Sequence, residues 1–201
     1  MEKMKILLTG FTPFGGESIN PALEAVKLVK SPAPGIEVRA LEVPTVFSLS
    51  AQTVTAAMDE YRPDAVICVG QAAGRSAVTP ERVAINIDDA RIPDNAGEQP
   101  VDSPIVPGAP AAYFATLPIK AVAQAIRAAG VPAEISNTAG TYVCNHLMYS
   151  VLHHAALHYP DMRAGFIHVP CIPEQTTGKD IPSLPLEKLV LALEAAVGAL
   201  M

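Results

Sequence analysis

The sequence contains no tryptophan, and only 17% of its 201 residues are charged, against about 25% in ordinary soluble domains. So few charges leave much of the surface apolar, and we expect copies of the chain to associate and bury part of it. Basic side chains are also scarce. The net charge is −6, which excludes the broad positive surface that nucleic-acid-binding domains use.

Long hydrophobic runs are absent as well. No stretch reaches the length of about 18 apolar residues that a membrane-spanning helix needs. The N-terminal apolar run, residues 6–8, is too short for the core of a signal peptide. The three cysteines are odd in number and widely spaced, which makes a disulfide framework improbable. We therefore expect a cytoplasmic protein without membrane or nucleic-acid partners.

Short apolar segments alternate with segments of helical spacing. The expected strands are residues 5–9, 37–43, 64–70, 83–87, 134–136 and 164–169, and the expected helices are residues 21–29, 48–61, 117–130, 144–159 and 186–200. Strands separated by helices indicate a parallel sheet covered by helices. We predict a single α/β domain over residues 1–201, an α/β/α sandwich around a central, mainly parallel (mixed) twisted sheet.

Such sheets bind ligands at the carboxyl ends of their strands. Loops follow the expected strands at Thr9, Gly70 and Val169. A polar, glycine-containing turn, residues 136–143, follows another. We expect these loops to meet at one edge of the sheet.

Cys144 is the leading candidate for a nucleophile. It stands where the polar turn gives way to a helix, and the free N–H groups of a helix start favour negative charge. The thiol is therefore expected to ionise more easily than a free cysteine. The alternative is a small buried helix residue, which describes most free cysteines. Cys68 lies within an apolar strand and is expected in the core, and Cys171 has no helix start to activate it.

A catalytic thiol needs a base, and five histidines compete for that role. Four of them, His146, His153, His154 and His158, lie on the helix after Cys144 and are expected on its partly exposed surface. His168 instead closes an apolar strand at its carboxyl end, where a polar side chain must find a partner. We assign His168 as the base; the alternative is a hydrogen-bonded core histidine.

The sequence alone does not decide which carboxylate or amide orients this base. Glu81 precedes an expected strand, and Asp88, Asp89 and Asp94 follow it as rivals. Arg91, in the same segment, could donate to an oxyanion. For each of these side chains the alternative is a solvated loop charge, and the residues alone favour that alternative.

The glycine-rich loop of residues 10–16 carries Phe11 and Phe14. It has neither the Gly-Lys-Ser/Thr ending of a P-loop nor the spacing of a dinucleotide loop. Aromatic side chains on a strand-end loop suit a small, flat ligand, although both rings could also be local core. A phosphate- or nucleoside-binding α/β enzyme that uses this loop is the alternative function. No Cys/His spacing matches a metal-ligand set, so we expect no metal.

Three segments together resemble pyroglutamyl peptidase I (pyrrolidone-carboxylate peptidase), a family of cytosolic cysteine peptidases. The first is TGFTPFGG (9–16) with Asn20-Pro21, the second is PERVAIN (80–86) with DARIPDN (89–95), and the third is SNTAGTYVCN (136–145) with FIHVP (166–170). Order, spacing and length agree, so the resemblance covers essentially the whole chain.

The resemblance implies a nucleophile at Cys144, a base at His168 and an orienting carboxylate at Glu81. It implies that Arg91 helps the oxyanion, together with backbone N–H groups near Cys144. The matching substrate-pocket residues are Phe11, Phe14, Gln71, Ile92 and Val143. The implied activity removes N-terminal pyroglutamate from peptides through an acyl-enzyme, needs no cofactor and often resides in a tetramer. A catalytically silent binding protein of the same fold fits the intact Cys144, His168 and Glu81 poorly.

Overall fold

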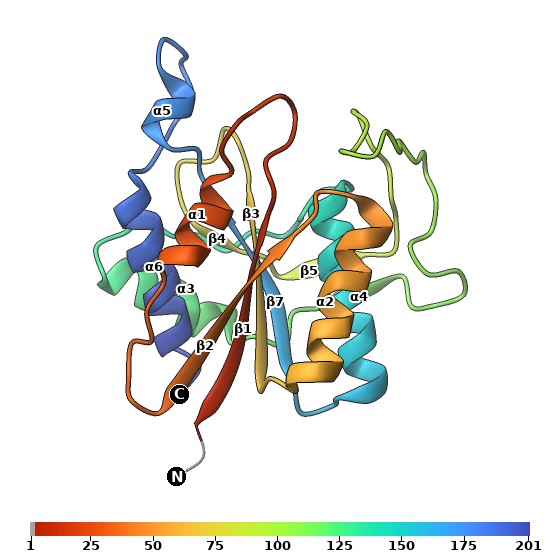
Figure 1. Ribbon diagram of the computed structural model, residues 1–201, viewed down its shortest axis with the longest axis horizontal. Helices are drawn as coiled ribbons and strands as arrows, with labels where there is room; N and C mark the ends of the chain where they lie inside the picture. Colours follow the sequence, from red (N-terminus) through yellow and green to blue (C-terminus); the bar gives the residue numbers. More distant parts are fainter. Residues whose placement is uncertain (1–2) are drawn as a thin grey trace.

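The computed structural model describes residues 3–201 and has three layers (Figure 1). The central sheet has the strand order β2-β1-β3-β7-β4. Its strands are β1 (Met4–Phe11), β2 (Ile36–Val43), β3 (Ala65–Gln71), β4 (Thr79–Pro80) and β7 (Arg163–Val169). All neighbours are parallel except β4, which runs antiparallel to β7. The predicted α/β fold with a mainly parallel, mixed sheet is confirmed.

Helices cover both faces of this sheet, as Figure 1 shows. One face carries α1 (Pro21–Leu28), α3 (Ile119–Ala128) and α6 (Leu186–Gly198), and the other carries α2 (Phe47–Tyr61) and α4 (Val143–His158). Because successive side chains of a strand point to opposite faces, β1 contributes side chains to both helical layers. Ile6 and Leu8 pack under the first group of helices, and Leu7 packs under the second.

The connection from β1 to α1 explains two features of its sequence. Asn20 caps the helix, since its Oδ1 accepts a hydrogen bond from the N–H of Ala22 at 3.1 Å. Gly10 lets the helix approach the strand closely: a Cβ there would lie 2.6 Å from the Cα of Leu23. The loop of residues 12–19 is thereby held at the carboxyl end of β1.

The segment between β4 and α3 differs from the prediction. It contains a second, two-stranded sheet of β5 (Val83–Ile85) and β6 (Ala112–Phe114), and β6 has too short an apolar pattern to be recognised. The expected strand at 134–136 forms only single bridges, from Ala133 to Val78 and from Ser136 to Glu81. A short helix, α5 (Pro173–Thr176), follows β7.

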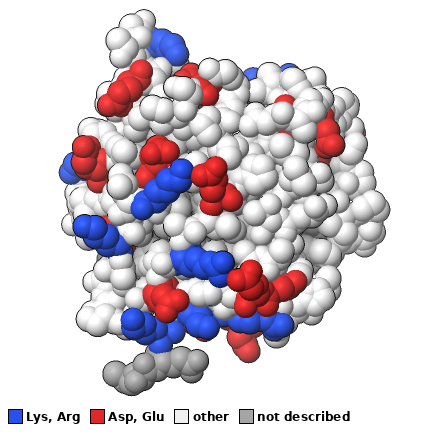
Figure 2. Space-filling view, viewed as in Figure 1, with Lys and Arg blue, Asp and Glu red and all other residues white. Residues whose placement is uncertain are grey.

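The surface agrees with the low and mixed charge of the sequence. On the face drawn in Figure 2, acidic and basic side chains are intermixed over the left and lower parts, and most of the right part carries neither. Within residues 3–201, no helix is both long and apolar enough to cross a membrane.

Candidate active site

The carboxyl ends of β3 and β7 lie beside the start of α4. In the register of the two strands, Gly70 is opposite His168. A Cβ built on Gly70 would lie 2.9 Å from Sγ of Cys144, so the thiol lies directly over this glycine. Because register partners in a parallel pair point to the same face, His168 projects toward the layer that contains Cys144. The structure therefore brings the predicted nucleophile and base together.

Glu81 is the carboxylate that contacts His168. It follows β4, whose Thr79 is paired with His168 in the sheet. Its Oε1 accepts a hydrogen bond from Nδ1 of His168 at 2.7 Å, and both side chains are buried. With Nδ1 as the donor, the neutral ring keeps its lone pair on Nε2, which is the tautomer a general base needs.

The three rival carboxylates have other partners or positions. Asp88 accepts from His146, and Asp94 accepts from the backbone N–H groups of Phe47 and Ala96. Asp89 lies at the wall of a surface cavity.

Burial controls the protonation of the two reacting groups. It raises the pKa of the Cys144 thiol to about 12, with the charge of Glu81 adding to the effect and that of Arg75 opposing it. Burial also lowers the pKa of His168, although Glu81 works in the other direction. Both shifts favour the uncharged forms, the thiol of Cys144 and the imidazole of His168. The helix start predicts a lowered thiol pKa, but the pKa of Cys144 is raised, with burial as the largest cause, so that expectation is wrong.

Glu81 remains ionised in this buried site. Burial alone would raise the pKa of its carboxyl group, but the hydrogen bond and charge of His168, and after them Ser136 and the charge of Arg75, outweigh it, so the pKa is lowered. An ionised carboxylate at this position stabilises the imidazolium that forms when His168 takes a proton.

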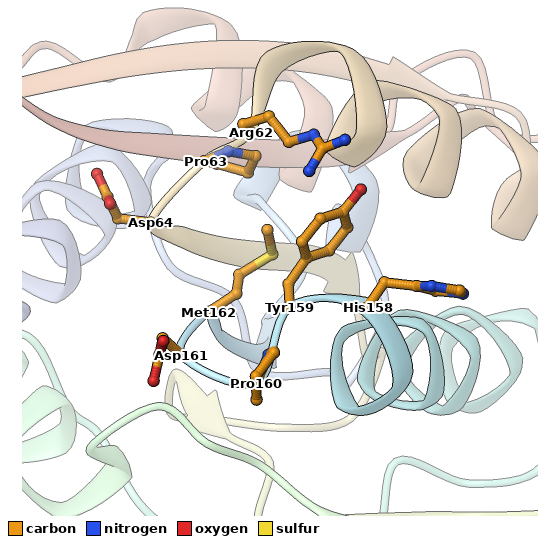
Figure 3. A pocket seen from close by; sticks show the side chains of 8 residues that line it. All are labelled: Arg62, Pro63, Asp64, His158, Tyr159, Pro160, Asp161 and Met162. Carbon is orange, nitrogen blue, oxygen red and sulfur yellow. The ribbon is translucent and has the colours of Figure 1, made fainter.

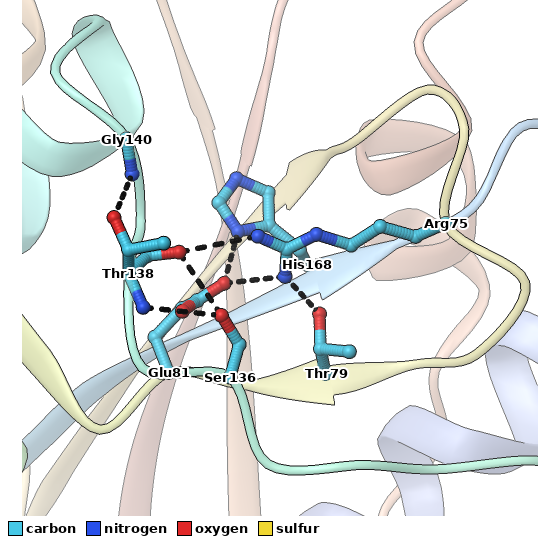
Figure 4. Close-up of polar contacts among 7 residues, drawn as sticks. All are labelled: Arg75, Thr79, Glu81, Ser136, Thr138, Gly140 and His168. Atoms are coloured by element: carbon cyan, nitrogen blue, oxygen red, sulfur yellow. Dashed lines mark hydrogen bonds and ion pairs between the residues drawn. The ribbon is translucent and has the colours of Figure 1, made fainter.

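Arg75 is a member of the cluster that the sequence did not single out. Its Nη1 donates to Oε1 of Glu81 at 2.6 Å and also contacts Oγ1 of Thr79. Its Nη2 donates to the carbonyl oxygen of Thr138 at 3.2 Å. Figure 4 shows the guanidinium between β4 and the turn that precedes Cys144. The available signal was modest: an arginine in a glycine-containing loop, six positions before the carboxylate.

A cavity of about 380 Å³ opens beside the start of α4. It is lined by Phe14, Asp89, Arg91, Ile92, Gly140, Thr141 and Tyr142. Three of the predicted site residues, Phe14, Arg91 and Ile92, are in this lining, and Arg91 and Ile92 are exposed. The remaining predicted pocket residues lie elsewhere.

Phe11 is buried, with its ring 6.3 Å from Phe166, whose ring is 4.7 Å from that of His168. It therefore lies under the site rather than on the cavity wall. Val143 is buried at the first turn of α4. Gln71 is half-buried and donates to Sγ of Cys171 and to Oε1 of Gln175, both at 3.1 Å.

Tyr142 is a cavity residue that sequence reasoning missed. It precedes α4 as its N-cap residue. Its ring faces Phe14, at 6.3 Å between centroids, and its hydroxyl donates to the carbonyl oxygen of Pro93. An aromatic side chain two positions before Cys144 was the signal that could have found it.

The prediction of a partly exposed surface position is wrong for His146. Its side chain is buried, with Nδ1 2.8 Å from Oδ2 of Asp88 and its ring edge-on to Phe47. The loop after β5 covers this side of α4, which sequence periodicity could not reveal. His153 pairs with the hydroxyl of Tyr113 and His154 pairs with Asp59, as partly exposed side chains. His158 is exposed.

A second hollow, of about 420 Å³, lies at the opposite end of the strands from the candidate site (Figure 3). Its lining comes from residues 62–64, just before β3, and from residues 158–162, just before β7. It therefore belongs to the amino ends of the strands, away from Cys144. Over residues 3–201, no cluster of three or more His, Cys, Asp or Glu side chains could hold a metal ion.

The space above Gly70 gives a direct test of this geometry. In Gly70→Ala the new methyl group would lie 2.9 Å from Sγ of Cys144 and 2.8 Å from Cζ of Phe166. Because misplacing a reacting atom by about 1 Å can cost about 100-fold in rate, we expect kcat to fall by at least that factor. Gly35→Ala is the control, since its methyl group would meet only Cε of Met201 at 3.9 Å. Wild-type turnover by folded Gly70→Ala would contradict the placement of the thiol.

Comparison with known proteins shows which family the whole chain resembles. The family model described as pyroglutamyl peptidase matches residues 4–201. A pyrrolidone-carboxylate peptidase of Levilactobacillus brevis is 58% identical over 198 residues, which is 98% of this chain and 97% of that one. A pyrrolidone-carboxylate peptidase of Streptococcus pneumoniae is 56% identical over 98% of this chain and 92% of its own.

Solved structures of these enzymes share the fold. Pyroglutamyl peptidase I from Bacillus amyloliquefaciens superposes with a TM-score of 0.96 at 50% identity, over 98% of this chain and 97% of that chain. A mutant pyrrolidone carboxyl peptidase from the hyperthermophile Pyrococcus furiosus gives a TM-score of 0.93 at 46% identity, over 98% of both chains.

Proposed function

Because the chain belongs to the pyroglutamyl peptidase family, we propose that Cys144, His168 and Glu81 perform its cysteine-type hydrolysis. The enzyme removes N-terminal pyroglutamate from peptides, as this family does. The observation that carries the residue assignment is the buried pair of His168 and Glu81, 2.7 Å apart, on the face of the sheet that Cys144 covers. Residues 1–201 act as one catalytic domain.

Catalysis begins with proton transfer from the thiol to the imidazole, the uncharged forms that the pKa shifts favour. Nε2 of His168 takes the proton of Cys144 as Sγ attacks the carbonyl carbon of pyroglutamate, and a C–S bond forms. Glu81 stabilises the resulting imidazolium. His168 then gives the proton to the departing amine as the C–N bond breaks, which leaves a thioester.

Water completes the cycle. His168 accepts a proton from the water that attacks the thioester, and it returns a proton to Cys144 as the C–S bond breaks. The products are free pyroglutamate and the regenerated thiol. The oxyanion of each tetrahedral intermediate is held by free N–H groups at the start of α4 and by Arg91. No cofactor takes part.

The cavity beside α4 is the binding place for the pyroglutamyl ring. This lactam carries no ammonium group, so an acidic anchor is of no use to it. Phe14, Ile92 and Tyr142 supply apolar walls, and backbone groups can match the ring N–H and C=O. Phe11 and Val143 are buried at the end of β1 and in the first turn of α4, from where we propose that they support the site, and Gln71 stands at the end of β3.

A chromogenic assay tests the function. The enzyme is expected to release the arylamine from pyroglutamyl-arylamide and to leave the prolyl analogue intact, because proline lacks the lactam carbonyl and carries a charged amine. The rate should not depend on phosphate, which separates this function from the phosphate-binding alternative. Absence of turnover by fresh, reduced enzyme would refute the proposal.

We further propose a cytoplasmic homo-oligomer, with a tetramer as the family state. Support comes from large apolar side chains that the isolated protomer leaves exposed, including Leu28, Phe114 and Leu157. Light scattering on the purified protein measures the assembly directly.

A further inference from the structure

The buried carboxylate of Glu81 has two donors on one oxygen. Oε1 accepts from Nδ1 of His168 at 2.7 Å and from Nη1 of Arg75 at 2.6 Å. The Glu81 side chain has no solvent exposure, whereas that of Arg75 is 27% exposed. A fully buried carboxylate is costly unless a positive charge and hydrogen bonds compensate it. Arg75 supplies a permanent positive charge 2.6 Å from this carboxylate.

The same guanidinium also reaches the turn before the nucleophile. Nη2 of Arg75 donates to the carbonyl oxygen of Thr138 at 3.2 Å. That turn is closed by its own bonds: Oγ of Ser136 donates to the carbonyl oxygen of Thr138, and Oγ1 of Thr138 accepts from the N–H of Gly140. One planar group with fixed donor geometry thus joins the Glu81 side to the Cys144 side of the site (Figure 4).

We propose that Arg75 is a positioning residue of the peptidase reaction, which locks Glu81 and the turn of residues 136–140 into one arrangement around His168. This inference rests on the proposed roles of Cys144, His168 and Glu81. Arg75 does not touch the reacting atoms, and it acts through the carboxylate and through the turn that leads into α4.

The charge of Arg75 supports this role. It opposes the effect of burial on Cys144, lowering the thiol pKa, and it also lowers the pKa of His168. The titratable groups that face Arg75 are Glu81 after β4, His168 on β7 and Cys144 on α4. Glu134 lines, with Arg75, a hollow of about 330 Å³ on the outer side. Loss of Arg75 should therefore raise the pKa of His168, and with it the pH at which activity appears.

The test compares Arg75→Gln with a matched control, Arg82→Gln. Arg82 binds the same turn, through Nε to Oδ1 of Asn137 at 2.7 Å, but its hydrogen bonds do not include Glu81. For Arg75→Gln we expect kcat to fall about 10- to 100-fold with KM unchanged, and the acid limb of kcat/KM to move to higher pH. Arg82→Gln should keep the wild-type acid limb.

A conservative variant separates the effect of the positive charge from the effect of joining Glu81 to Thr138. Arg75→Lys keeps the positive charge but cannot donate to Glu81 and Thr138 through one planar fork. It should hold the acid limb at its wild-type position while kcat remains below wild type. Arg75→Lys can also replace Arg75→Gln in the test if Arg75→Gln fails to fold. In that case, a wild-type kcat in Arg75→Lys would overturn the proposal that Arg75 joins Glu81 to the turn.

A readout without turnover distinguishes the two proposals. Alkylation of the Cys144 thiol by iodoacetamide, followed against pH, should shift to higher pH in Arg75→Gln. If the wild-type enzyme has no pyroglutamyl-arylamide activity, the proposed function fails while this readout still reports on Arg75. An active wild type with unchanged kcat and unchanged alkylation profile in Arg75→Gln would overturn the positioning role. A loss of kcat without either pH shift would reduce Arg75 to a structural role and overturn it as well.

Discussion

Replacing Cys144 by alanine is expected to remove turnover of pyroglutamyl substrates, with kcat falling by up to about 10⁶-fold. The physical reason is that no other thiol lies over Gly70 beside His168 in the residues that the structure describes. Without a nucleophile, the acyl-enzyme cannot form, and only the binding cavity and the oxyanion donors remain. Arylamide hydrolysis by purified Cys144→Ala measures the loss.

The other two cysteines supply matched controls. Cys68 is buried in the middle of β3, and Cys171 is buried after β7, where it accepts a hydrogen bond from Gln71. Cys68→Ser is expected to lower stability by about 1–3 kcal/mol, because it buries a hydroxyl group, but to keep most of kcat. Cys171→Ser should also remain active. If Cys171→Ser were inactive and Cys144→Ala active, the nucleophile would be misassigned.

Glu81→Gln is expected to have the second largest effect, a loss of about 10³- to 10⁴-fold in kcat with little change in KM. A neutral amide cannot stabilise the imidazolium of His168, and its NH₂ group can turn toward Nδ1 and select the wrong tautomer; a comparable change in a serine protease costs about 10⁴-fold. The substitution also leaves Arg75 without the carboxylate that it binds. Steady-state kinetics at several pH values measure the effect.

The stability of Glu81→Gln should depend on pH with a defined sign. The folded-state pKa of Glu81 lies below its ordinary value, so the charged group stabilises the fold above that ordinary pKa and stops doing so as the pH falls through the folded one. The difference in Tm between wild type and Glu81→Gln should therefore be large at neutral pH and shrink in acid.

Glu134→Gln, at the rim of the outer hollow, is the control for the activity measurement and should keep wild-type activity. Full activity of Glu81→Gln would remove Glu81 from the mechanism.

The four long strands of the central sheet, the five long helices and two residues of the candidate site could be predicted from local pattern. The continuous apolar run of residues 65–69 requires burial on both faces, and β3 has it. Asn20 and Pro21 mark a helix start, and α1 begins there. Cys144 and His168 stand out because each is a reactive side chain at an element terminus facing the carboxyl edge of the sheet.

Glu81 could not be selected from local pattern, because its role depends on long-range pairing. The antiparallel β4 places it beside a histidine 87 positions away, and a segment of only two residues carries no periodic signal. Arg75 was hidden for the same reason, since its partners are contributed by β4 and by the turn before α4. Resemblance to the family supplied Glu81, whereas only the structure supplied Arg75.

Two further differences arise from burial, which sequence patterns report poorly. Phe11 and Phe14 are three positions apart, yet Phe11 ends β1 in the core and Phe14, in the loop that follows, lines the cavity. The pKa of Cys144 is raised although the thiol stands at a helix start, because its partial burial removes hydration and the charge of Glu81 lies nearby. The helix start locates the reactive cysteine correctly but does not predict the direction of its pKa shift.

The central claim is that Cys144 is acylated by pyroglutamate during turnover. Acid quenching of wild-type enzyme during steady-state hydrolysis, followed by peptide mass spectrometry, locates the acyl group directly. We predict a pyroglutamyl thioester on the peptide that contains Cys144, and none on the peptides that contain Cys68 or Cys171. An acyl group on Cys68 or Cys171, with Cys144 unmodified and still open to alkylation during turnover, would contradict the account.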